Sequence, residues 1–265
     1  KKEKIDIIPV LTITKKIKTY LSTNNTKTEL SLSNKVNLKN IPLVIMAGGR
    51  GTRLKPFTEV FPKPLIPVNN IPAVEHIIRF FNKSGIKKIF LTLNYKKKLI
   101  RSYFEDNIFK LKYIEEKKEM GTAGSLSLLK NKIKSDFFCC NCDTLLKINL
   151  EKFYDYHKKG KFMMTLVVAT KNYGVPYGSC LLDKNGNLKK IVEKPNNDYL
   201  INTGLYIMKK NTIDIIHKNN IKNMDELIRL ITQKKMKIGV FPISDSNWTD
   251  VGEWSEYNKL ILNTK

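Results

Sequence analysis

The chain has 265 residues, of which 42% are hydrophobic and 27% are charged, a composition typical of a folded domain and not of a disordered chain. Lysine and arginine number 48 against 24 aspartates and glutamates, a net charge of +24, but only five of the 48 are arginine, the residue that nucleic-acid-binding sites favour. We therefore expect no nucleic-acid partner, and no membrane insertion either, because no apolar run approaches the roughly 18 to 20 residues of a membrane span.

Residues 1–40 differ in pattern from the rest of the chain. Segments 5–10 and 17–21 have the pattern of two short strands, and 22–40 is a polar stretch of Ser, Thr, Asn and Lys typical of a linker. Two strands cannot bury a core alone. We expect this segment to belong to an upstream module or to pack on the main body, and a separate domain to cover residues 41–265.

From residue 41 onwards, strands and helices alternate. This spacing predicts right-handed crossovers and an α/β domain with a mainly parallel sheet. Ligands bind such sheets at the carboxyl ends of the strands, so we expect the loops after Ala47, Glu115 and Asn141 to line a pocket. The predicted strands are 42–47, 88–93, 111–115, 135–141, 162–169, 179–182, 188–193 and 200–208, and the predicted helices are 72–83, 96–105, one opening near 121, 225–233 and 253–262.

The first of these loops is rich in glycine, and residues 46–56 read MAGGRGTRLKP. Glycines directly after a buried strand let backbone N–H groups approach an anion. The loop is not a Walker A motif, and it fits the dinucleotide fingerprint poorly because Leu54 stands where a third small residue is needed. Lys63 follows between two prolines, which restrict the backbone on both sides of it. Together with Arg53, these residues predict a phosphate-binding site.

The four cysteines predict neither a disulfide framework nor a zinc site. Cys139, Cys140 and Cys142 lie in one apolar stretch, and the three histidines are scattered along the chain, so no second ligand cluster is evident. We expect buried, reduced thiols in a cytoplasmic protein.

Residues 48–58 (GGRGTRLKPFT) and 61–65 (FPKPL) resemble the signature of the sugar-1-phosphate nucleotidylyltransferases. Six further segments match in the family's order, so that the resemblance covers about residues 41–262. The spacing is most similar to that of the bacterial members that make GDP-linked sugars. The six segments are 121–124 (GTAG), 141–145 (NCDTL), 176–178 (PYG), 193–195 (EKP), 202–206 (NTGLY) and 248–252 (WTDVG).

The resemblance implies a fold and a reaction. The fold is a Rossmann-like, mainly parallel mixed sheet flanked by helices, with an inserted antiparallel sugar-binding part. The reaction transfers a nucleotidyl group from a nucleoside triphosphate to a sugar 1-phosphate and releases pyrophosphate, for surface glycan or polysaccharide synthesis. Some similar proteins carry a tandem CBS module upstream, and we interpret residues 5–22 as the last strands of such a module. We also consider a homo-oligomer.

The resemblance also assigns residues to the nucleotide and the phosphates. Arg53 is expected to neutralise the triphosphate, and Lys63 to bridge the α-phosphate and the sugar phosphate. The residues expected to contact the nucleotide, besides Arg53, are Ala47, Gly48, Gly49, Gly51, Thr52, Glu116, Gly121 and Thr122.

Asp143 and Asp250 match the family's two Mg²⁺ ligands. Each follows an apolar run, 137–142 and 238–243, so we expect each to end a strand at the edge of the pocket. Two carboxylates suffice because Mg²⁺ fills its remaining positions with water and substrate oxygens. A lone aspartate after a strand is more often a turn or helix cap. Many family members also have glycine where Cys142 stands here.

The base and the sugar are expected to meet different side chains. Glu116 favours GTP, because one carboxylate accepts from both N1–H and N2–H of guanine, whereas uracil and thymine suit an amide. Glu115 is its neighbour and is easily confused with it. The residues expected at the sugar phosphate are Gly178, Glu193, Lys194, Asn202 and Thr203, although Asn202 and Thr203 also fit a bulge within a strand.

Three other functions remain open at this point. A uridylyl- or thymidylyltransferase would carry the same motifs with a different base contact. A non-catalytic nucleotide-sugar sensor would lack Lys63, Asp143 or Asp250, yet all three are present. A nucleic-acid-binding protein would show clustered arginines with interleaved aromatic residues, and none is evident.

Overall fold

The computed structural model describes residues 7–11, 17–22 and 36–262. Packing divides the chain between Val36 and Asn37 into two compact units. In the first unit, β1 (Ile7–Leu11) and β2 (Ile17–Ser22) form an antiparallel pair. These are the two strands predicted near the N-terminus, although the predicted start at residues 5 and 6 lies outside the described residues. The identity of the upstream module stays a prediction.

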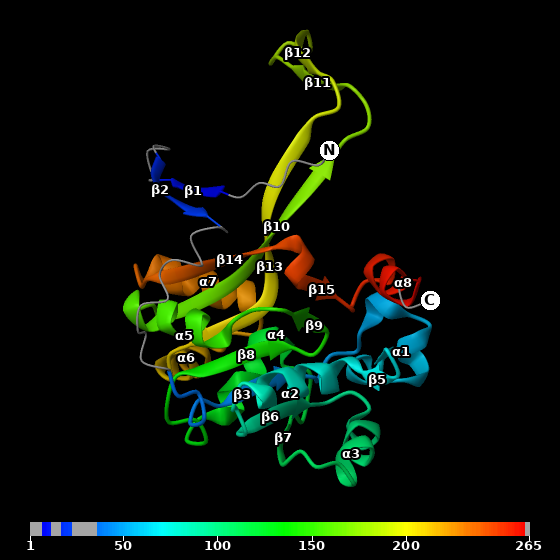
Figure 1. Ribbon diagram of the computed structural model, residues 1–265, viewed down its shortest axis with the longest axis vertical. Coiled ribbons are helices and arrows are strands. Elements are labelled where there is room, and N and C mark those ends of the chain that lie inside the picture. The colour runs from blue at the N-terminus through cyan, green and yellow to red at the C-terminus, as the bar shows by residue number, and fades with distance from the viewer. Residues whose placement is uncertain (1–6, 12–16, 23–35, 263–265) are drawn as a thin grey trace. The chain divides into compact units, whose positions relative to one another are not determined.

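The second unit is built on a sheet of seven strands in the order β14-β10-β13-β8-β3-β6-β7 (Figure 1). Strands β8, β3, β6 and β7 are parallel, β10 and β14 are parallel to each other, and β13 runs antiparallel to β8 and β10. The predicted mainly parallel mixed sheet is therefore confirmed. The strands are β3 (Leu43–Met46), β6 (Ile89–Leu93), β7 (Leu111–Glu115), β8 (Phe137–Asn141), β10 (Met164–Gly174), β13 (Asn196–Met208) and β14 (Ile238–Ser244).

Helices cover both faces of this sheet. On one face, a core of buried side chains joins the strands to α4 (Gly121–Gly124), α6 (Asn211–Asn219) and α7 (Met224–Gln233). On the other face, Phe138 of β8 packs against Phe81 of α2 (Ala73–Lys83) and Phe153 of α5 (Leu150–Lys159). Because successive residues of a strand point to opposite faces, the adjacent Phe137 enters the first core. This explains why the strands read as continuous apolar runs.

Helices α5 and α6 and several short elements were not predicted from the sequence. Helix α5 has an N-cap signal, since the Asn149 side chain accepts a hydrogen bond from Lys152 N at 2.8 Å. The predicted helix near residue 121 is a single turn followed by a 3₁₀ turn, Ser125–Leu129. Helices α3 (Lys97–Glu105) and α8 (Trp254–Leu262) correspond to predicted helices. The short elements that were not predicted include α1 (Phe57–Val60) and the strands β4 (Pro67–Val68), β5 (Ile71–Pro72), β9 (Thr144–Leu146) and β15 (Trp248–Asp250).

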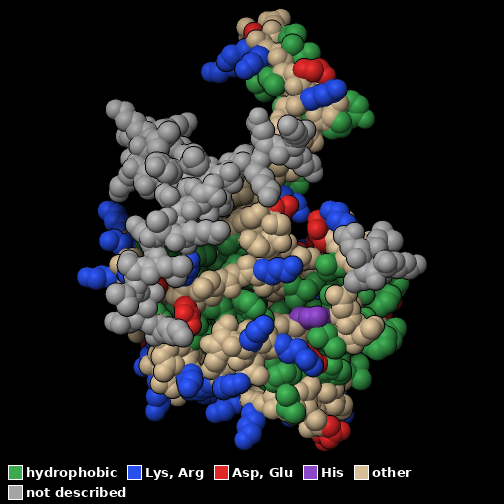
Figure 2. Space-filling model, viewed as in Figure 1, with side chains coloured by type: hydrophobic (Ala, Val, Ile, Leu, Met, Phe, Trp, Pro, Cys, Tyr) green, Lys and Arg blue, Asp and Glu red, His purple; other side chains and the backbone are tan. Residues whose placement is uncertain are grey.

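A two-stranded arm, residues 172–198, extends from the carboxyl edge of the sheet (Figure 1). It consists of the ends of β10 and β13, which pair up to Gly174 and Asn196, and of the hairpin β11 (Ser179–Leu182) and β12 (Leu188–Val192). Its apolar side chains are exposed: Leu182, Leu188 and Ile191 keep about 60% of their accessible surface. Figure 2 shows hydrophobic side chains on this arm interspersed with basic and acidic ones.

The expectation of buried thiols holds for three of the four cysteines. Cys139, Cys140 and Cys142 are buried, whereas Cys180 lies exposed on β11 of the arm, so the expectation is wrong for that residue. The four thiols form no disulfide. Across the described parts of both units, no helix is long and apolar enough to cross a membrane.

Candidate active site

The glycine-rich loop after β3 folds directly over Lys63. Gly51 adopts a left-handed conformation (φ 66°), and the Thr58 hydroxyl donates to its carbonyl oxygen at 2.9 Å. A Cβ on Gly51 would lie 2.8 Å from the Cβ of Lys63. Glycine is therefore required here both for the backbone angle and for the close approach. This packing holds the lysine against the loop, and its side chain is only 14% exposed.

Three predicted catalytic side chains converge on one point, which is marked by Gly252. Lys63 forms an ion pair with Asp143, and Gly252 N donates to Asp250 Oδ1 at 2.8 Å. A Cβ placed on Gly252 would lie closer than 3.0 Å to Asp143 Oδ2, to Lys63 Nζ and to Asp250 Oδ1. The structure thus brings together one ammonium and two carboxylates from distant parts of the chain.

A short strand pair aligns the two aspartates. Asp143 follows β8 and precedes β9, while Asp250 is the last residue of β15, which pairs antiparallel with β9 and places Asp250 opposite Thr144. Val251 N also donates to Asp143 O at 3.0 Å. The expectation that Asp250 ends the run at 238–243 is wrong, because that run is β14, which ends at Ser244. The β9–β15 pair positions Asp250 instead.

The electrostatics of this cluster fit a divalent cation. Burial, together with the neighbouring Asp143 carboxylate, raises the pKa of Asp250 to about 6. A cation between the two carboxylates would relieve this repulsion, and oxygen ligands suit Mg²⁺. Among the described residues, no group of three or more His, Cys, Asp and Glu side chains offers a richer ligand set. Burial raises the pKa of Cys142 to about 12, so its thiol stays neutral beside the aspartates.

Glu116 and Glu115 lie in different environments, which removes the ambiguity between them. Glu115 is exposed and pairs with Lys97 and Arg101. Glu116 is 6% exposed, and its carboxylate packs against the glycine-rich loop, since a Cβ on Gly48 would lie 2.5 Å from Oε1. Burial raises the pKa of Glu116, and the Met120 N–H, 3.3 Å from Oε2, opposes that rise. The loops after β3 and β7 therefore meet, as expected.

The other residues expected at the nucleotide differ in whether contacts within the protein already occupy them. A Cβ on Gly49 would meet no atom within 4 Å, so this position of the loop is open. Ala47 is buried and donates to Thr92 O at 3.1 Å. Thr122 Oγ1 accepts from Met224 N at 2.9 Å, and Gly121 (φ 75°) presses against the Lys222 carbonyl. Gly121 and Thr122 thus anchor α4 to the start of α7.

The segment 202–204 forms the bulge that was the alternative interpretation. The register of β10 and β13 shifts between Leu166 and Val168, opposite this segment. Thr203 is 2% exposed and donates to Val167 O at 3.0 Å, and Asn202 Oδ1 accepts from Gly204 N at 3.1 Å. Both side chains therefore already form hydrogen bonds within the protein.

Gly178, Glu193 and Lys194 lie on the arm and are not brought to the Lys63 cluster. Gly178 and Glu193 are neighbours, since a Cβ on Gly178 would lie 3.0 Å from Glu193 Oε2. Strand β10 pairs with β14 only as far as Thr170 but with β13 as far as Gly174, so β10 and β13 continue together for roughly 13 Å beyond the sheet edge. This continuous pairing is the physical reason for the separation.

Both arginines of the loop carry acidic partners. Arg53 Nη1 pairs with Glu253 Oε1, and Arg50 Nε pairs with Glu119 Oε1. Glu253 and Gly252 were not expected at the site. Gly252 is the last residue of the motif at 248–252 and Glu253 directly follows it, and this position was the available signal.

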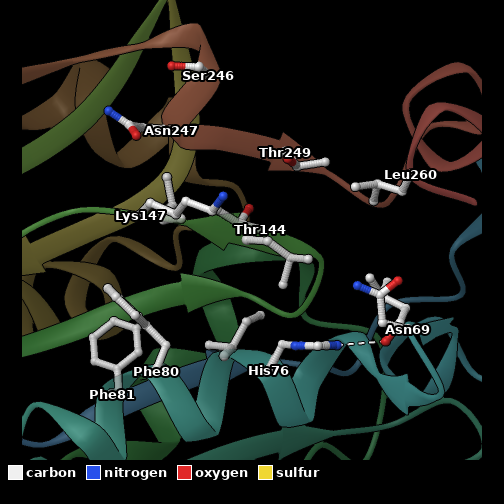
Figure 3. Close-up of a pocket in the computed structure, with 14 residues that line it drawn as sticks. Asn69, His76, Phe80, Phe81, Thr144, Lys147, Ser246, Asn247, Thr249 and Leu260 are labelled. Atoms are coloured by element: carbon white, nitrogen blue, oxygen red, sulfur yellow. Dashed lines mark hydrogen bonds between the residues drawn. The ribbon is translucent and has the colours of Figure 1, made fainter. Parts of the chain in front are cut away.

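A separate pocket of about 340 Å³ lies between α2, the β9–β15 pair and α8 (Figure 3). Phe80 and Phe81 line one side of it, and the His76 ring nitrogen Nε2 lies 2.7 Å from Val68 O. Its lining contains Thr144 and Thr249, the neighbours in sequence of Asp143 and Asp250, but none of the predicted site residues.

The fold and the cluster together define a class. An α/β sheet whose glycine-rich loop, buried lysine and paired carboxylates meet at its carboxyl edge is a nucleotide-binding protein of the nucleotide-diphospho-sugar transferase fold. The family model described as Nucleotidyl transferase matches residues 43–265, and the chain therefore belongs to the nucleotidyl transferase family.

Similar proteins include enzymes of known reaction. The chain is 30% identical over 223 residues to the D-glycero-alpha-D-manno-heptose 1-phosphate guanylyltransferase of Campylobacter jejuni, covering 83% of this chain and 98% of that protein. It is 32% identical over 230 residues to the bifunctional protein GlmU of Methanocaldococcus jannaschii, covering 83% of this chain but 54% of that longer protein. The crystal structure of HddC from Yersinia pseudotuberculosis superposes with a TM-score of 0.66 at 26% identity, over 85% of this chain and 100% of HddC.

Proposed function

We propose that the protein transfers a guanylyl group from GTP to a sugar 1-phosphate and releases pyrophosphate, with Mg²⁺ as cofactor. The observation that carries this proposal is the convergence of Lys63, Asp143 and Asp250 at Gly252, beside the glycine-rich loop. Family membership and the similarity to the Campylobacter guanylyltransferase support it.

In this proposal the protein acts by alignment and charge. Phosphoryl transfer accumulates negative charge on phosphate oxygens, so positioned cations and N–H groups stabilise the transition state. The backbone of residues 47–52 wraps the nucleotide, and Arg53 offers a fork of donors to the triphosphate. Lys63, a compact charge fixed by Gly51 and the prolines, lies between the α-phosphate and the attacking sugar phosphate.

Asp143 and Asp250 are the residues that would hold Mg²⁺. Their carboxylates lie within reach of each other, and the raised pKa of Asp250 reflects a repulsion that a cation would relieve. When bound, Mg²⁺ supplies positive charge at the transferring phosphate. The Lys63 ammonium pairs with Asp143, one of these two carboxylates.

The choice of GTP rests on Glu116. Its carboxylate is buried beside Gly48 and can accept two hydrogen bonds from the N1–H and N2–H edge of guanine. Exposed Glu115 offers no such enclosed acceptor. The HddC crystal structure complexed with GMP-PN is a guanine-nucleotide complex of a similar fold, which also supports this choice.

The acceptor is a sugar 1-phosphate, and the nucleotide sugar serves glycan synthesis. Glu193 and Lys194, which the resemblance assigns to the sugar phosphate, lie on the arm away from Lys63, so this proposal does not rest on them. The name of the Campylobacter enzyme makes a heptose 1-phosphate the first acceptor to test.

The test is incubation with each of GTP, UTP, dTTP, CTP and ATP, with Mg²⁺ and a panel of sugar 1-phosphates, followed by measurement of pyrophosphate release. We expect turnover with GTP, and loss of most of kcat in Lys63→Ala and Asp143→Ala. Turnover with UTP or dTTP but not GTP would refute the role of Glu116. Nucleotide-sugar binding without turnover for any pair would indicate a non-catalytic sensor.

The Glu116 argument has its own matched pair of variants. Glu116→Gln is expected to lower kcat/KM for GTP about tenfold or more, because it removes a charged acceptor. Glu115→Gln makes the same chemical change at an exposed position and is expected to leave kcat/KM unchanged.

A further inference from the structure

The basic side chains at the loop do not stand free in the described structure. Arg50 pairs with Glu119, Arg53 with Glu253, and Lys63 with Asp143. The three acidic partners come from three different connections: the loop after β7, the junction of β8 and β9, and the turn between β15 and α8. An incoming polyphosphate therefore exchanges existing ion pairs and does not meet bare cations.

The Arg53–Glu253 pair is more exposed than the Lys63–Asp143 pair, and it lies closer to the catalytic aspartates than the Arg50–Glu119 pair, which is also exposed. The side chains of Arg53 and Glu253 are 58% and 42% exposed, so the pair is accessible to exchange, whereas Lys63 and Asp143 are nearly buried. Arg53 also lies within electrostatic reach of Asp250 and Asp143, which help to raise its pKa against the effect of burial. For Arg50, the pKa is raised chiefly by its hydrogen bond to Glu119.

Glu253 is also coupled by sequence to the reaction centre. It directly follows Gly252, where Lys63, Asp143 and Asp250 converge, and it precedes the first residue of α8. Any shift of the turn 250–253 therefore changes the contact between Glu253 and Arg53 as well.

We infer that Glu253 is an internal anion that competes with polyphosphate for the Arg53 guanidinium, and that it tunes both the affinity for nucleoside triphosphate and the release of pyrophosphate. This inference rests on the proposed function, which places the triphosphate at Arg53. On binding, the guanidinium exchanges the Glu253 carboxylate for phosphate oxygens. When pyrophosphate leaves, the carboxylate returns, and no covalent bond forms or breaks in this exchange.

The exposure of the pair sets the size of the effect. Exposed ion pairs contribute a small free energy that converts to about two- to fivefold in a binding constant. Removing the charge of Glu253 while keeping its size is expected to tighten pyrophosphate binding by this factor. It is expected to lower KM for GTP and, where pyrophosphate release limits turnover, to lower kcat as well.

The experiment compares Glu253→Gln with wild type by calorimetric titration of pyrophosphate, without any turnover. The control is Glu151→Gln, which removes the same charge from an exposed residue of α5. We expect a two- to fivefold lower dissociation constant in Glu253→Gln alone, and a smaller difference at 0.5 M NaCl because salt screens exposed pairs. Thermal unfolding of each variant serves as the check that it is folded.

Two results would overturn the inference. One is an equal or weaker affinity for pyrophosphate in Glu253→Gln. The other is an equal gain in Glu151→Gln, which would reflect net charge only. Because the titration needs no reaction, its failure is distinguishable from failure of the proposed function, which is read from pyrophosphate release by the wild-type protein.

Discussion

Gly252→Ala is the substitution that tests the convergence of the three catalytic side chains with the smallest chemical change. The added Cβ would lie 2.5 Å from Lys63 Nζ and 2.9 Å from Asp250 Oδ1, and it would also crowd Asp143 Oδ2. Ordinary van der Waals contact begins at 3.4 Å, so the ammonium has to retreat by about 1 Å. A displacement of this size at reacting groups costs roughly 100-fold in rate.

The same substitution is expected to preserve the fold. Gly252 is not in the left-handed region, so alanine fits its backbone, and the loss of freedom in the unfolded chain offsets part of the crowding. We expect kcat for pyrophosphate release to fall about 100-fold while the melting temperature changes by only a few degrees. Ser255→Ala, on the exposed surface of α8, is the control. Turnover within about twofold of wild type in folded Gly252→Ala would refute the reasoning.

Three further predictions concern the loop, a buried histidine and the thiols. Gly49→Ala, whose Cβ meets no atom in the protein, is expected to raise KM for the nucleotide about tenfold without changing the melting temperature; an unchanged KM would place the nucleotide elsewhere. Burial lowers the pKa of His157 to about 4. Because the unfolded chain binds a proton at this histidine more readily, the free energy of unfolding is expected to fall by about 3 kcal/mol as the pH decreases from 6.5 towards 4. His157→Gln is expected to flatten this pH dependence in denaturant unfolding, whereas the exposed control His217→Gln is not. A thiol reagent is expected to label Cys180 alone rapidly in the native protein, and mass spectrometry of the labelled peptides would reveal a second fast site that contradicts the burial of the other three.

The local parts of the site could be predicted because each is a short pattern with a physical requirement. The glycine-rich loop needs residues that tolerate close backbone approach, and the prolines around Lys63 restrict its backbone. The alternation of apolar strands and helices likewise predicted the parallel sheet and its carboxyl edge. The structure adds that Gly51 packs on the Lys63 side chain and Gly48 on Glu116, contacts that tie these local patterns together.

Long-range pairing accounts for what could not be predicted. The β9–β15 pair joins Leu146 to Trp248, and a three-residue strand leaves almost no periodic signal. The arm depends on how far β10 and β13 stay paired, a property of two strands together and not of either one. Cys180 is exposed because it lies on the arm, so composition alone could not predict its exposure.

The most direct test of nucleotidyl transfer at this site is ³¹P nuclear magnetic resonance of the wild-type protein with GTP, Mg²⁺ and a heptose 1-phosphate. We predict paired diphosphate resonances of a guanosine diphosphate sugar that grow together with pyrophosphate, and their absence in Asp143→Ala. Orthophosphate as the sole product, or an unchanged spectrum with every sugar 1-phosphate and nucleotide tried, would contradict the account.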